Sequence, residues 1–120
     1  MRIVIPSSDV TQWALQGCLW LLDRHWPAHP PVVIGGYTPP PFPLPDYAEF
    51  RSLGRFADFP ANRWSDGLLA LLATLADEAI LIHFDDFWLV QDVDDSAVRT
   101  LYQHLLDSPH LARIDLTSDR

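Results

Sequence analysis

The sequence contains no lysine, a single cysteine and no long apolar run. Without lysine, chemistry that uses a phosphate-loop lysine or a Schiff-base lysine is excluded. Cys18 has no disulfide partner within the sequence, and its apolar helical surroundings favour a buried small hydrophobe over a nucleophile. No apolar run has the length of a membrane span, and the N-terminus lacks the features of a signal peptide. We therefore expect a cytoplasmic protein with no membrane span.

Basic residues are also few, since the sequence has eight arginines and sixteen acidic residues, and the net charge is −8. Binding to nucleic acid or to an anionic membrane needs a clustered basic surface, so we expect no nucleic-acid partner. A polyanionic ligand remains compatible with this charge if a metal ion supplies the positive charge. An arginine-, alanine-, proline- and leucine-rich chain without lysine is typical of a GC-rich bacterial genome.

The chain alternates between strand and helix signals over a length that suits one domain, residues 1–120. Short apolar or β-branched runs predict strands at Arg2 to Ile5, Val32 to Ile34, Phe50 to Leu53, Ala79 to Phe84 and Leu111 to Leu116. Helical spacing predicts helices at Val10 to His25, Gly67 to Ala76 and Ala97 to Leu106. This order predicts an α/β fold, a three-layer α/β/α sandwich with a mostly parallel, Rossmann-like sheet.

Two segments allow more specific predictions. The helix Gly67 to Ala76 is apolar nearly all round, which predicts packing on several sides, and Asp77 and Glu78 are expected to end it. Tyr37 to Asp46 holds five prolines and predicts a stiff irregular connector, with a docking segment for an aromatic-lined groove as the alternative. Residues 55–60 are expected to form an irregular loop, and residues 117–120 to trail off.

The strand Ala79 to Phe84 has no polar alternation, which is typical of a strand buried on both faces, and it is followed by Asp85 and Asp86. Ligands of open parallel sheets bind beyond the carboxyl ends of the strands, so these acids are expected to face water where a ligand would lie. Mg²⁺ in proteins takes one or two carboxylates plus substrate phosphates. Both acids reach one metal only if the chain bends there. The alternative is a pair of solvated turn formers, and His83 is expected to be a hydrogen-bonded core residue.

Three other polar groups are weaker candidates for a site. Asp92 and Asp94 precede a helix, where acids are expected as caps, so we rank them below Asp85 and Asp86. The cluster Ser7, Ser8 and Asp9 follows the first strand and opens a helix. Its amides suit an anion and Asp9 suits a base or ribose, although plain capping explains it equally well. Asn62 and Arg63 open the helix before the acidic strand, and Arg63 is either a phosphate ligand or an ordinary surface arginine.

Taken together, several segments resemble the N-terminal, nucleotide-binding half of a GT-A type glycosyltransferase. They are VIPSSD after the first strand, a helix ending in HWP, the strand VVIGG, and NRWSDGLLALLATL leading into EAILIHFDDFWL. The resemblance implies that Asp85 and Asp86 bind a divalent metal (Mn²⁺ or Mg²⁺) and the diphosphate of a nucleotide-sugar donor. It implies that Ser7, Ser8 and Asp9 contact the nucleotide, with Asn62 and Arg63 near the donor. The acids read DDF rather than D-x-D.

The function expected from this resemblance is sugar transfer from a nucleotide-sugar to an unknown acceptor. The acceptor-binding half of such an enzyme is expected to lie outside this chain. One alternative is a non-catalytic interaction or assembly domain of the same fold, which would form a homo-oligomer through an exposed sheet edge or apolar face. Another is a metal-dependent phosphoryl-handling enzyme that uses the same acids.

Overall fold

The structure is a computed structural model that describes residues 1–76 and 79–116. Four parallel strands form its sheet. The strands lie in the order β3-β2-β1-β4, and every neighbouring pair is parallel. The elements in chain order are β1 (Ile3–Pro6), α1 (Gln12–His25), β2 (Val32–Gly36), β3 (Ala48–Ser52), a 3₁₀ turn (Ala61–Arg63), α2 (Trp64–Leu72), β4 (Leu81–Ile82) and α3 (Asp95–Asp107). The predicted α/β fold with a parallel sheet is confirmed.

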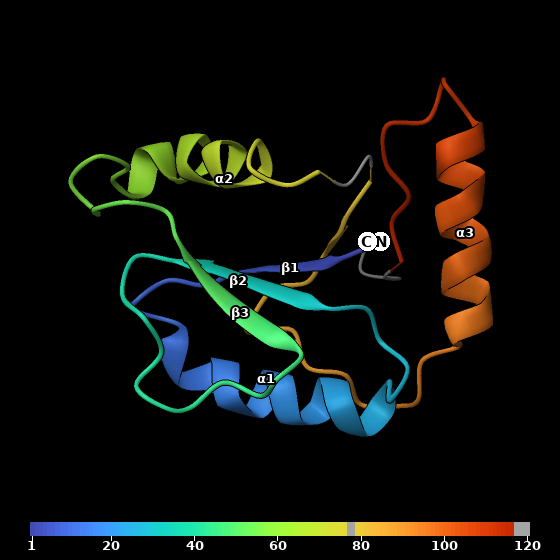
Figure 1. Ribbon diagram of the computed structural model, residues 1–120, viewed down its shortest axis with the longest axis horizontal. Coiled ribbons are helices and arrows are strands. Elements are labelled where there is room, and N and C mark those ends of the chain that lie inside the picture. Colours follow the sequence, from blue (N-terminus) through green and yellow to red (C-terminus); the bar gives the residue numbers. More distant parts are fainter. Residues whose placement is uncertain (77–78, 117–120) are drawn as a thin grey trace.

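The two faces of the sheet are covered by different helices. Successive side chains of a strand point to opposite faces, so β1 places Ile3 and Ile5 on one side and Val4 on the other. The first face packs with the apolar side of α1, and the second packs with Leu68 and Leu71 of α2. Figure 1 shows α1 and α2 on opposite sides of the sheet. The three-layer arrangement therefore follows from the period-two pattern of the central strands.

Close packing between α2 and β2 depends on Gly35. A β-carbon built at this position would lie 2.4 Å from Cδ2 of Leu71, well inside van der Waals contact. The missing side chain therefore lets Leu71 lie directly against the strand.

The helix α3 stands beside the end of the sheet where β1 begins (Figure 1). Its first turn is tied to the residues that follow α1, because Nε1 of Trp26 donates to the Asp95 carboxylate at 2.8 Å and Nη2 of Arg99 donates to the Ala28 carbonyl at 3.1 Å. None of its residues is buried. The expected helix is confirmed, and Asp94 caps it as expected, since its Oδ1 accepts from the Ala97 amide at 3.0 Å.

The strand that precedes Asp85 and Asp86, β4, differs from its prediction in length and burial. Only Leu81 and Ile82 pair with β1, and 44% of Ile82 is exposed. Because β4 lies at the end of the strand order, one of its edges has no strand beside it among the described residues. A strand was therefore correctly predicted here, but its extent from Ala79 to Phe84 and its burial on both faces were wrong.

Two further predictions are corrected. The helix α2 ends at Leu72, and 64% of Leu69 is exposed, so α2 packs through one face rather than several. Leu111 to Leu116 form no strand, because the Leu111 amide bonds to the Ser108 carbonyl at 2.9 Å and the chain turns there. The expected helix-ending acids Asp77 and Glu78, and residues 117–120, lie outside the described residues.

The segments that the sequence predicted to be irregular are irregular in the structure. Residues 37–46 contain no helix or strand, nor do residues 55–60, and the strand expected near Phe50 is β3. Across the described ranges, no helix combines the length and apolar character needed to cross a membrane.

Candidate functional site

The carboxylate of Asp85 joins the loops that leave two neighbouring strands. Its Oδ2 accepts hydrogen bonds from Oγ of Ser7 and Oγ1 of Thr11, each at 2.7 Å. Ser7 directly follows β1, and its amide donates to the Gly35 carbonyl of β2 at 2.8 Å. Asp85 follows β4 by three residues and is only 3% exposed. These contacts brace the carboxyl end of the sheet, where open α/β sheets bind ligands.

The two adjacent acids have different environments. The Phe87 amide donates to the Phe84 carbonyl at 3.1 Å, so the chain bends at Asp85 and Asp86. The bend turns Asp85 inward, where two hydroxyl donors compensate for its burial, and leaves Asp86 exposed. The expectation that both acids face water was therefore wrong for Asp85.

Ser8 is engaged in a local turn that leads into α1. The Thr11 amide donates to Oγ of Ser8, and the Ser8 amide donates to Oγ1 of Thr11, both at 3.2 Å. This reciprocal pair closes the turn before α1, whose N-cap is Thr11 and has no side-chain cap, so the capping role that the sequence offered for Ser8 is not seen.

Asp9 holds the connector that follows β2. Its carboxylate accepts from the amide and hydroxyl of Thr38 at 3.3 and 3.0 Å, and Nε2 of Gln12 donates to the Thr38 carbonyl at 2.8 Å. The start of the proline-rich segment is thus fastened over the first turn of α1. Asp9 itself remains exposed.

Asn62 and Arg63 lie exposed in the 3₁₀ turn before α2. The first turns of α1 and α2 lie at the same end of the sheet but on opposite faces (Figure 1). Nε of Arg63 donates to Asp66 at 2.8 Å within its own helix. The structure therefore brings Ser7 and Asp85 into contact, places Ser8 and Asp9 beside them, and leaves Asn62 and Arg63 on the other side of the sheet.

The described residues fit one way of holding a divalent cation better than another. No group of three or more His, Cys, Asp or Glu side chains converges within residues 1–76 and 79–116, so a cage built by the protein alone does not fit. Oδ2 of Asp85 already receives two hydroxyl donors. The exposed Asp86 carboxylate fits the mode in which Mg²⁺ takes one or two carboxylates and completes its shell with substrate phosphates and water.

His83 and Cys18 lie near the acidic turn, and burial shifts the pKa of each toward its neutral form. Burial lowers the pKa of His83, while a backbone hydrogen bond to Phe87 and the charge of Asp85 act in the opposite direction. The ring therefore has a backbone hydrogen bond, as expected of a hydrogen-bonded core residue, but its buried Nε2 has no partner in the described part of the chain. Burial, followed by the charges of Asp85 and Asp86, raises the pKa of the Cys18 thiol to about 12. This agrees with the expected inert role of Cys18.

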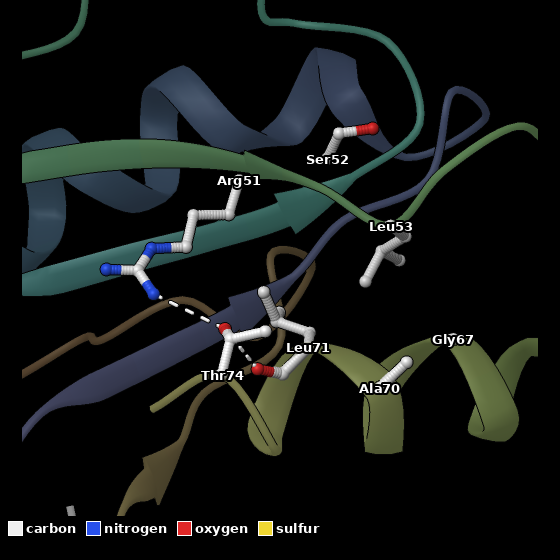
Figure 2. Close-up of a pocket in the computed structure, with 7 residues that line it drawn as sticks. All are labelled: Arg51, Ser52, Leu53, Gly67, Ala70, Leu71 and Thr74. Atoms are coloured by element: carbon white, nitrogen blue, oxygen red, sulfur yellow. Dashed lines mark hydrogen bonds between the residues drawn. The ribbon is translucent and has the colours of Figure 1, made fainter. Parts of the chain in front are cut away.

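A hollow of about 350 Å³ lies between the end of β3 and α2, away from the acidic turn. Figure 2 shows Arg51 reaching across it to Thr74, with a hydrogen bond of 3.3 Å, above the apolar side chain of Leu71. Nε and NH2 of Arg51 also contact Glu49, at 2.9 and 2.7 Å. Because β3 and β4 form opposite edges of the sheet, this hollow is separate from the Asp85 site.

Thr11 and Thr38 are the site residues that the sequence did not reveal. Thr11 lies four residues after Ser7 at the start of a helix, where a hydroxyl is an ordinary capping signal, and no sequence pattern marks Thr38. Comparisons with protein-family models, with curated proteins and with solved structures gave no match to this chain. The functional argument therefore rests on the geometry of the Asp85 site.

Proposed function

We propose that this chain is a glycosyltransferase-like domain that binds a nucleotide-sugar donor at the carboxyl end of its sheet, for transfer of the sugar to an acceptor. The observation that supports the proposal most is the bond between Ser7 and Asp85. It fixes the loops after β1 and β4 relative to each other, at the edge where parallel sheets bind nucleotides. A preorganised edge of this kind lowers the cost of ordering loops around a ligand.

The proposal gives the two acids separate roles. Asp86 is the metal ligand, because its carboxylate is exposed, and Asp85 positions the turn that presents it. A bound Mn²⁺ or Mg²⁺ would supply positive charge for the leaving diphosphate. In this proposal Asp9 would contact the nucleoside, whereas Arg63, which lies on the other face of the sheet and pairs with Asp66, is not part of the donor site.

Thermal unfolding with nucleoside diphosphates, each with and without Mn²⁺ or Mg²⁺, tests the proposal. A ligand that binds only the native state stabilises it, by about 2.7 kcal/mol at a hundredfold excess over its Kd. We expect one nucleotide to raise the midpoint in a metal-dependent way, and Asp86→Asn to abolish the rise. Asp107→Asn, which removes an exposed charge on α3, is the control and should keep it. If no nucleotide raises the midpoint, or if Asp86→Asn leaves the rise intact, the proposal is wrong.

A second candidate function is supported by the edge of the sheet. The short strand β4 has an open edge in the described structure, and Ile82 and Phe84 are 44% and 40% exposed beside it. Such an edge favours an assembly domain that forms homo-oligomers. Sedimentation over a range of concentrations distinguishes the two, since a monomer at every concentration would contradict this candidate. Self-association weakened by Ile82→Lys would support it.

A further inference from the structure

Two exposed tryptophans meet beside the Asp85 contact. Trp13 of α1 is 77% exposed and Trp88, in the loop after β4, is 47% exposed. Their ring centroids are 6.5 Å apart, and the ring planes are inclined by 73°. Nε1 of Trp88 donates to the Asp85 carbonyl at 3.3 Å, so the pair borders the candidate donor site.

This pair is held in place by its surroundings. A β-carbon at Gly17 would lie 3.5 Å from the Trp88 ring, so the indole packs directly on the backbone of α1. We call Trp13 and Trp88 the tryptophan platform. Exposed apolar surfaces of this kind mark binding sites more often than isolated exposed residues do.

The charge around the platform disfavours anionic ligands. Asp86 is exposed in the same turn as Phe87, and the whole chain carries a net charge of −8. This negative field opposes nucleic acid and anionic lipid. A neutral saccharide matches both features, because its hydroxyl groups donate to a carboxylate. Its C–H faces, which carry partial positive charge, lie against the negative face of an aromatic ring.

We propose that the tryptophan platform binds a neutral saccharide through stacking on Trp13 and Trp88. This binding does not depend on the proposed donor site, which the platform borders through the bond from Nε1 of Trp88 to the Asp85 carbonyl.

The test follows the indole N–H signals of the five tryptophans by NMR while maltopentaose, cellopentaose and chitopentaose are added without nucleotide. We expect one of them to shift the Trp13 and Trp88 signals saturably and to leave the Trp26 signal unchanged. Trp13→Ala should weaken binding by roughly tenfold or more. The matched control is Trp20→Ala, which removes another exposed tryptophan of α1, one that pairs with Arg24 instead, and it should bind normally.

Three outcomes would overturn the proposal. The first is that no oligosaccharide shifts either signal in the folded protein. The second is binding to phosphatidylglycerol vesicles that Trp13→Ala abolishes, and the third is concentration-dependent dimerisation that Trp13→Ala abolishes. Saccharide binding without any thermal shift by nucleotides would instead refute the donor site alone. A nucleotide shift without saccharide binding would refute the platform alone.

Discussion

The side chains of Ser7 and Asp85 lie 2.7 Å apart, although 78 positions separate them in the sequence. Thr11, 74 positions from Asp85, donates to the same carboxylate oxygen. Both donors belong to the segment between β1 and α1, whereas the acceptor follows β4. The carboxyl end of the sheet is therefore cross-linked by one buried carboxylate.

Asp85→Ala is expected to destabilise the fold. It leaves the buried Ser7 hydroxyl without its acceptor, which costs roughly 1–3 kcal/mol, and it removes one partner of the half-buried Thr11 hydroxyl. Urea denaturation measures the loss. Asp86→Ala is the matched control, and because its side chain is exposed we expect a change within about 0.5 kcal/mol. Equal losses in the two variants would contradict the assigned roles.

Thr11→Val tests the second donor with little change in shape. Valine keeps the branched side chain but loses both the bond to Asp85 and the acceptor of the Ser8 amide, so we expect a loss of about 1–1.5 kcal/mol in the free energy of unfolding. Thr11→Ser keeps the hydroxyl and should retain most of this contribution. If the serine and valine variants unfold at the same denaturant concentration, the Thr11 hydroxyl does not stabilise the fold.

Gly35→Ala and Gly17→Ala are predicted to act in opposite directions. At Gly35 the added carbon would clash with Leu71 at 2.4 Å, and overpacking of this kind costs about 1–3 kcal/mol. At Gly17 it would make an ordinary 3.5 Å contact with Trp88, and alanine in a helix is favoured over glycine by up to about 1 kcal/mol. Chemical denaturation of both variants checks the signs, and a stabilised Gly35→Ala would refute the close contact with α2.

Protonation of His83 is expected to weaken the fold in mild acid. Its pKa is lowered in the folded protein, so the unfolded chain binds more protons and the free energy of unfolding falls as the pH drops. The loss begins near the unfolded histidine pKa of about 6.5 and stops growing once the pH is below the folded pKa. We expect His83→Gln to reduce this slope between about pH 7 and pH 5. Equal slopes in the wild-type protein and in the His83→Gln variant would contradict the assignment.

Local signals in the sequence were sufficient for most of the fold. The β-branched runs and helical spacing predicted β1, α1, β2 and α3, because each signal lies within its own element. Asp94 was recognised as a cap for the same reason, since its partner is the nearby Ala97 amide.

Features that depend on distant segments could not be predicted from local signals. The burial of Asp85 depends on donors more than seventy residues away, so the acid looked like a solvated ligand in the sequence. The apolar run before it resembled a central strand, but its place at the edge of the sheet exposes Ile82. An apolar run indicates that a segment packs against other residues of the fold. Its position in the strand order is set by the rest of the chain.

The attachment of α3 has a consequence for how the protein opens. Trp26 and Ala28 bond to its first turn, Val98 packs against the core and Tyr102 donates to the Ala79 carbonyl, but none of its residues is buried. Segments with few buried contacts separate at a lower free energy than the whole fold. Amide hydrogens of α3 should therefore exchange with solvent well before those of α1 and β1. We expect this outer helix to detach first and to leave the sheet and the Asp85 cross-link assembled.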